Sequence, residues 1–298
     1  MEPGSDGHEA IRARPILRAP LVTPVQEPTA RLSEPSATPS GRWVSPNTAP
    51  GWPPSDAPYD DSLVVRQPRR EVFLDLVVGT AGFFVALVLL ELFAAVASGG
   101  DPARSSNGWV WVAQRAILSV VTICLITGLL MRNEQPLRSI GVRADRPMPA
   151  LLWGVVAYAT ILGYVLTVST VVNLIWPGAA RAMEELERGH MQRLPPMNLA
   201  QMILFSLGVA VSEEVLFRGF IMTRLRSLTG SWAVAILLIS AAFAVLHIPQ
   251  GGLAVSVIFG LSVLLGIWMV WRRNVLVPIL AHALFDTTSL AVLNYAVR

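Results

Sequence analysis

About seven long apolar stretches follow one another after residue 70, and they constrain the fold of this chain more than any other feature. A helix of about 20 apolar residues crosses the hydrocarbon core of a membrane, where lipid offers no partner to a free backbone polar group. The sequence therefore predicts an all-α, polytopic helical bundle that passes several times through the cell membrane. The predicted spans cover residues 72–97, 109–131, 150–176, 198–220, 232–248, 253–271 and 275–296.

Residues 1–70 have a different composition from the rest of the chain. More than half of the 22 prolines lie there, among Ser, Thr, Ala and Arg. Such a segment buries too little apolar surface to offset the entropy of ordering, so it is predicted to be a disordered cytoplasmic tail. Residues 71–298 are the predicted transmembrane domain. The net charge of +3 comes from arginines in connections and indicates no nucleic-acid partner.

Arginines predict the orientation of the bundle, because loops on the cytoplasmic side carry an excess of positive charge. They gather before the first span and after the second, fourth and sixth spans, whereas the opposite connections carry fewer or pair them with glutamates. This bias predicts a cytoplasmic N-terminus and an outer C-terminus. In the connection 177–198, a solvated loop is favoured over a surface helix at EELE, residues 184–187.

A few charged residues lie within the predicted spans. Glu91 and Arg115 occupy matching depths in the first two spans, about six residues from the outer end of each, so they are predicted to pair between helices. Asp75 lies near the inner boundary, within reach of water.

The fourth span contains adjacent carboxylates in the stretch VSEEVLFRGFIMTR, residues 211–224. Glu214 and Arg218 are four residues apart and share a helix face, so they can pair. Glu213 is rotated by about 100° and has no local partner. Because an unpaired carboxylate in an apolar helix costs several kcal/mol, Glu213 is predicted to face a cavity or a residue elsewhere in the chain.

Two other apolar segments offer partners for Glu213. FAVLHI ends the fifth span with His247, and AHALFDTT in the last span contains His282 and Asp286. The distances of these residues from the helical turns place all three segments at one level, provided that the hairpin near residues 229–230 projects beyond the membrane. Asp286 follows His282 by four residues and is predicted to orient its imidazole.

Carboxylate and imidazole groups in a site shielded by lipid suit hydrolysis. Glu213 would act as general base on water, one histidine would share that water or protonate the leaving amine, and the other would donate to the oxyanion. The alternative is a zinc site formed by Glu213, His247 and His282. The HExxH arrangement, which puts both histidines on one helix, is absent from the sequence.

These residues also fit three motifs in order along the chain: EExxxR at 213–218, FxxxH at 243–247 and Hxxx(N/D) at 282–286. Together the motifs resemble those of the CAAX protease and bacteriocin-processing family of intramembrane proteases, which includes the Ras-converting CAAX endopeptidase. The resemblance covers roughly residues 150–298. It implies an all-helical membrane core with endopeptidase activity on protein or peptide substrates.

By this resemblance, Glu213 activates water with His247, while His282 and Asp286 support the oxyanion. Glu214 and Arg218 match the supporting positions of the first motif. We expect a metal-free mechanism with no cofactor, and zinc is the alternative. Eukaryotic members have Asn in the place of Asp286; an ionised Asp cannot donate to an oxyanion, so Asp286 is expected to act by orienting His282.

Two other classes of function stay open at this point. The first is a non-catalytic membrane scaffold or bacteriocin-immunity protein of the same fold. The second is a proton-coupled transporter that uses Glu and His as a relay. An unpaired Glu213 beside a paired Glu214 favours the protease. The spans show no inverted repeat in the sequence, which counts against a transporter.

Overall fold

The regular structure is entirely helical in the described part of the chain, which comprises residues 63, 65, 67–97, 107–143, 147–191 and 194–296. This computed structural model therefore confirms the predicted all-α class. Most of the predicted tail lies outside the described residues. The elements are, in chain order, α1 (Arg69–Ala97), α2 (Gly108–Arg132), η3 (Leu137–Ile140), α3 (Pro147–Ile175), α4 (Pro177–Met191), α5 (Leu199–Glu214), η4 (Val215–Ile221), α6 (Met222–Thr229), α7 (Trp232–Val245), η5 (Ile248–Gln250), α8 (Gly252–Arg272) and α9 (Leu276–Ala296).

Six of the described helices are long and apolar enough to cross a membrane, one fewer than predicted. They are α1, α2, α3, α8, α9 and the continuous helix Leu199–Thr229, which joins α5, η4 and α6. The predicted fifth span, 232–248, is represented by α7, whose 14 residues extend only about 21 Å. Pro249 and the positive φ of Gly251 (95°) belong to the turn that stops this segment.

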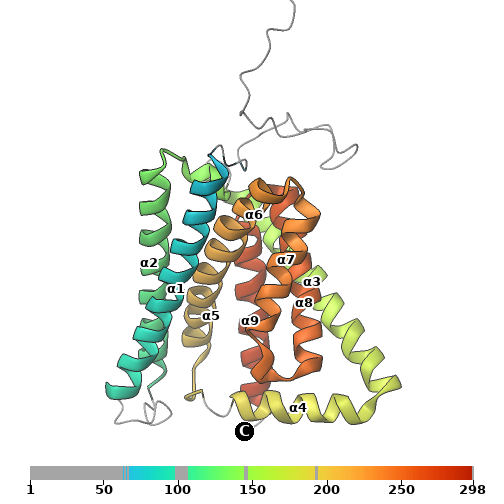
Figure 1. The fold of residues 1–298 in the computed structure, drawn as a ribbon. Helices are drawn as coiled ribbons and strands as arrows, with labels where there is room; N and C mark the ends of the chain where they lie inside the picture. The colour runs from blue at the N-terminus through green and yellow to red at the C-terminus, as the bar shows by residue number, and fades with distance from the viewer. Residues whose placement is uncertain are drawn as a thin grey trace, which may run out of the picture. The chain divides into compact units, whose positions relative to one another are not determined.

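The connection between α3 and the fourth span is a helix, so the predicted solvated loop is wrong. α4 runs across one end of the bundle, at a steep angle to the long helices (Figure 1). Pro177 at its first position has a φ that suits a helix start, and Ala, Glu and Arg that follow have high helix propensity. Leu186 of α4 packs against Gly251, where an added Cβ would lie 2.8 Å from Leu186 Cδ1.

The arginine-rich helix ends that the sequence predicts on one side of the membrane lie at the same end of the bundle. The start of α1, the end of α2 and the α6–α7 turn lie at one end of the bundle, and α4 and the end of α9 lie at the other (Figure 1). Arg224 of α6, at the first of these ends, is fully buried and donates a hydrogen bond to Gln135 Oε1 at 2.7 Å.

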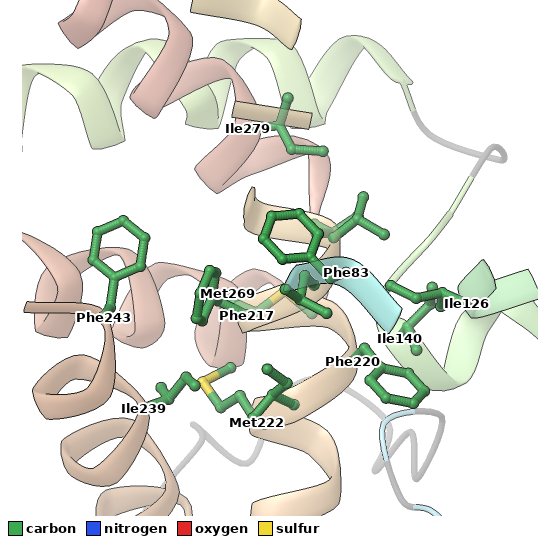
Figure 2. Packing of buried hydrophobic residues seen from close by; sticks show 14 of the residues in the cluster. Phe83, Ile126, Ile140, Phe217, Phe220, Met222, Ile239, Phe243, Met269 and Ile279 are labelled. Carbon is green, nitrogen blue, oxygen red and sulfur yellow. The ribbon is translucent and has the colours of Figure 1, made fainter. Parts of the chain in front are cut away.

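The main apolar core surrounds η4, which is buried along its whole length. Figure 2 shows Phe217 and Phe220 of this segment among residues of the neighbouring helices. The Phe217 ring lies edge-on to Phe83 of α1 (6.4 Å between centroids) and to Phe243 of α7 (5.1 Å). Gly219 permits a close approach of η3, because a Cβ there would lie 3.0 Å from the Ile140 carbonyl oxygen.

The α1–α2 hairpin contains the predicted Glu91–Arg115 pair, whereas Asp75 is buried and not near water as predicted. Arg115 donates to Glu91 Oε1 at 2.8 Å, which confirms the predicted pair between the helices. Asp75, predicted to reach water, is 1% exposed and accepts hydrogen bonds from Asn133 Nδ2 at 2.9 and 2.8 Å. The helix hairpin supplies this partner from a residue that is distant in the sequence.

The last residues of the predicted tail contribute to the core. Leu63 and Val65 are buried, and the Val65 carbonyl accepts a hydrogen bond from Ser227 of α6 at 3.2 Å. The packed part of the chain therefore includes residues that precede the predicted boundary at residue 71.

Candidate active site

The two adjacent glutamates end α5 at the point where the helix widens into a π-helical turn. α5 begins with a capping box in which Asn198 and Gln201 exchange side-chain and backbone hydrogen bonds. From Val215 to Ile221 the continuous helix is π-helical. Such turns occur mostly as single-turn bulges inside α-helices and frequently at functional sites. The sequence predicts a regular α-helix over this stretch, and the π-helical turn is a difference from that prediction.

The predicted pair within this helix is present and completely buried. Arg218 NH1 donates to Glu214 Oε1 at 2.7 Å, and both side chains are 0% exposed. The other terminal nitrogen of Arg218 donates to Ser262 Oγ of α8 at 2.9 Å. The guanidinium also lies over the Phe243 ring, with its central carbon 4.6 Å from the centroid.

His282 of α9 joins the two glutamates. Its Nδ1 donates to Glu214 Oε1 at 2.7 Å, so this one carboxylate oxygen accepts from both Arg218 and His282. The other ring nitrogen, Nε2, lies 4.0 Å from Glu213 Oε2 and 3.4 Å from Asp286 Oδ2. The predicted Asp286–His282 contact is therefore present. The shorter contact with Glu214 is one that the sequence analysis missed.

His247 lies just beyond the end of α7, and the Phe243 ring contacts both His247 and His282. His247 Nδ1 is 2.8 Å from the Phe243 carbonyl oxygen, which can only accept, so Nδ1 carries a hydrogen and the lone pair of the neutral form is on Nε2. The His247 ring packs on Phe243 (4.8 Å between centroids), and the Phe243 ring also lies edge-on to the His282 ring (6.5 Å).

Among the described residues no hydrogen bond or ion pair joins Glu213 to His247. Glu213 Oε2 lies 4.0 Å from His282 Nε2 instead, and His247 Nδ1 bonds to the Phe243 carbonyl. The three predicted segments therefore meet around His282 and Phe243, rather than around a direct contact between the two residues predicted to activate water.

Exposure divides the site residues into two groups. The side chains of Glu213 and Asp286 are 26% and 29% exposed, whereas those of Glu214 and Arg218 are 0% exposed and that of His282 is 9% exposed. Glu213 and Asp286 are thus within reach of a bound molecule. Glu214 and Arg218 act only on their protein neighbours.

The site residues do not match the geometry of a metal centre. In the part of the chain that the structure describes, no three or more His, Cys, Asp or Glu side chains are grouped so that they could hold a metal ion. The alternative zinc set, Glu213, His247 and His282, accordingly does not form such a group. The side chains that are present suit acid–base chemistry by carboxylate and imidazole.

Fold and site together define a class of protein, a multi-pass helical membrane protein with carboxylates and imidazoles gathered inside its bundle. Residues 195–288 match a family model described as Type II CAAX prenyl endopeptidase Rce1-like. This region is thus a domain of the Rce1-like CAAX prenyl endopeptidases, a family of peptidases, as the motifs predicted. The matched region is shorter than the predicted 150–298 and contains every candidate site residue. No curated protein and no solved structure matched the chain.

Proposed function

We propose that this protein is an intramembrane endopeptidase that hydrolyses peptide bonds of membrane-associated proteins or peptides. The observation that supports it most directly is the accessible carboxylate of Glu213, 4.0 Å from His282 Nε2, inside a domain of a peptidase family. General base catalysis on water and donation to the oxyanion both speed peptide hydrolysis, and an exposed carboxylate beside an imidazole can supply them.

In the proposed reaction, Glu213 takes a proton from water, and the oxygen of that water attacks the carbonyl carbon of the scissile bond. His247, whose Nδ1 is held by the Phe243 carbonyl, contacts the same water through Nε2. The carbonyl π electrons move to oxygen and form the oxyanion. When the tetrahedral intermediate collapses, the C–N bond breaks and the proton carried by Glu213 passes to the leaving amine.

His282 stabilises the oxyanion in this proposal. Its Nδ1 already donates to Glu214, so donation from Nε2 requires both nitrogens to carry hydrogen and the ring to be an imidazolium. The carboxylates of Glu214 and Asp286, 2.7 and 3.4 Å from the two ring nitrogens, favour that charge. Arg218 holds Glu214 in place from the other side.

The proposed membrane orientation follows the arginines, with the N-terminus and the arginine-rich helix ends in the cytoplasm. Labelling of single cysteines on either side of the membrane tests it. A Cys124→Ser background removes the one native thiol.

The proposed activity is tested by comparing cells that make the wild-type protein with cells that make a Glu213→Ala variant. Membrane peptidomes identify peptides that disappear with the variant, and a quenched fluorescent peptide with a prenylated cysteine three residues before its C-terminus tests that substrate class directly. We expect cleavage by the wild type alone. Equal peptidomes and no cleavage by purified protein would favour the scaffold or immunity alternative, and proton flux in vesicles would favour the transporter.

Chelation distinguishes the proposed mechanism from the zinc alternative. If Glu213 activates water directly, exhaustive chelation leaves the cleavage rate unchanged, and purified protein contains no stoichiometric zinc. A loss of activity that zinc restores and magnesium does not would contradict the metal-free mechanism.

A further inference from the structure

Helix α8 carries none of the sequence motifs, yet it supplies one polar side chain to the site. Ser262 is 0% exposed and accepts a hydrogen bond from Arg218 NH2 at 2.9 Å. Arg218 NH1 donates to Glu214 Oε1 at 2.7 Å, and that oxygen accepts from His282 Nδ1, also at 2.7 Å. An unbroken chain of hydrogen bonds thus joins α8 to His282 of α9 through the continuous helix between them.

The hydrogen bond that Ser262 accepts fixes the guanidinium of Arg218. A guanidinium is a rigid planar fork, so contacts at both terminal nitrogens define the orientation of its plane. The face of Arg218 is held at the same time by the Phe243 ring. If the Ser262 contact is lost, NH2 has no oxygen partner and the plane can turn about the remaining contact with Glu214.

Rotation of the Arg218 guanidinium would displace His282, because Glu214 binds both side chains through one of its two carboxylate oxygens. Glu214 Oε2 is buried and has no hydrogen-bond partner among the described residues, so the carboxylate is held by the two donors on Oε1. A displaced Arg218 therefore moves the group that holds His282 Nδ1. The direction of Nε2, the nitrogen that faces Glu213 and Asp286, changes with it.

Other buried serines in the bundle serve a different purpose. Ser212 donates to the Gly208 carbonyl one turn earlier in its own helix at 3.0 Å, which is the usual way for a serine to be satisfied inside an apolar helix. Ser262 instead contacts a charged side chain 44 positions away in the sequence. Ser240 of α7, also 0% exposed, has a hydroxyl with no hydrogen-bond partner among the described residues.

We propose that Ser262 is a positioning residue of the site, which acts through Arg218 and Glu214 to hold the His282 imidazole in its working orientation. The catalytic consequence rests on the proposed function. The effect on His282 itself does not, since it follows from the hydrogen bonds alone.

The test compares Ser262→Ala with Ser262→Thr, which keeps the hydroxyl, and with Ser240→Ala as the matched control. Two quantities are measured in detergent-purified protein: kcat and KM on a cleaved peptide, and the imidazole NMR signals of protein labelled with ring-15N histidine. The chain contains only four histidines, so the His282 signal is assigned by its loss in His282→Gln.

We expect Ser262→Ala to lower kcat by about 10-fold to 100-fold, the usual scale for one hydrogen bond to a charged group, with little change in KM. The His282 signal shifts in this variant. Ser262→Thr restores both quantities, and Ser240→Ala changes neither.

Each other outcome has a definite meaning. An unmoved His282 signal in Ser262→Ala overturns the proposal, whatever happens to activity or thermal stability. Equal loss in Ser262→Thr overturns the role of the hydroxyl. A shifted signal in a protein whose wild type cleaves no peptide supports the positioning role and counts against the proposed peptidase function alone.

Discussion

Two of the glutamate–arginine pairs in the apolar helices of this bundle have almost the same geometry. Glu214 and Arg218 approach to 2.7 Å, and Glu91 and Arg115 to 2.8 Å. The first pair is 0% exposed on both sides, whereas Glu91 and Arg115 are 43% and 17% exposed. Distance and charge alone therefore do not distinguish the pair at the candidate site from a pair that joins two helices.

The two pairs differ in the further side chains that each pair contacts. Glu214 also holds His282, and Arg218 also holds Ser262, so this pair links α5, α8 and α9. The Glu91–Arg115 pair joins α1 to α2, with the Phe205 ring 5.8 Å from the guanidinium. A buried ion pair adds little net stability by itself because desolvation offsets attraction, so its value depends on what it positions.

The largest effect is expected from the carboxylate that has no arginine partner. Glu213→Gln keeps the shape of the side chain and removes the base, so kcat should fall by about 10²-fold to 10⁴-fold, the range that general base catalysis contributes. Membrane insertion and thermal stability should stay close to those of the wild type, because Glu213 is partly exposed and lies outside the buried ion pair. Steady-state cleavage and thermal unfolding in detergent measure both.

Glu91→Gln is the matched control for that variant, since it changes a partly exposed glutamate in another membrane helix. Its cleavage rate should stay within about twofold of the wild type. A fully active Glu213→Gln protein would contradict the assignment of the base. An inactive Glu91→Gln protein would remove the distinction between the two pairs.

The next effect concerns stability and separates the pairs directly. Glu214→Ala leaves the Arg218 charge without a carboxylate partner, and Arg218→Ala leaves Glu214 with His282 as its one donor. Breaking a buried pair costs about 3–5 kcal/mol, so we expect that range for Glu214→Ala and the lower end of it for Arg218→Ala. Arg115→Ala or Glu91→Ala should cost less, because those side chains are partly exposed. Equilibrium unfolding measures the four variants. If Glu214→Ala and Arg218→Ala keep normal stability, the buried pair has another source of compensation.

Local patterns account for the parts of the molecule that the sequence predicted well. The i, i+4 spacing predicted the Glu214–Arg218 pair and the Asp286–His282 contact, because neighbours on a helix face are fixed by 3.6 residues per turn. Runs of apolar residues predicted the long helices for the same local reason. Matching depth in two adjacent spans was enough to pair Glu91 with Arg115.

Contacts that depend on packing between distant segments were not predictable. Nothing near Ser262 in the sequence distinguishes it from an ordinary serine in an apolar helix, and its partner lies 44 positions away. Asp75 finds Asn133 only because α1 and α2 fold back on each other. The π-helical turn at Val215–Ile221 has no periodicity that a sequence pattern would reveal, and the bond between Glu214 and His282 spans 68 positions.

The smallest effect is expected at Asp286, where the chain departs from the eukaryotic motif. In serine proteases, replacing the carboxylate on histidine Nδ1 by an amide costs about 10⁴-fold in kcat, because the imidazole takes the wrong tautomer. Here that nitrogen is held by Glu214 at 2.7 Å, and Asp286 lies 3.4 Å from the opposite nitrogen. Asp286→Asn should therefore lower kcat by about tenfold or less, equivalent to about 1.4 kcal/mol in the barrier.

Glu214→Gln should lower kcat much more than Asp286→Asn does, because Glu214 holds the His282 nitrogen Nδ1. Comparing the pH–rate profiles of the two variants with the wild type decides between them: a loss near 10⁴-fold in Asp286→Asn would make Asp286 the orienting carboxylate, and equal rates at every pH would leave it a structural residue.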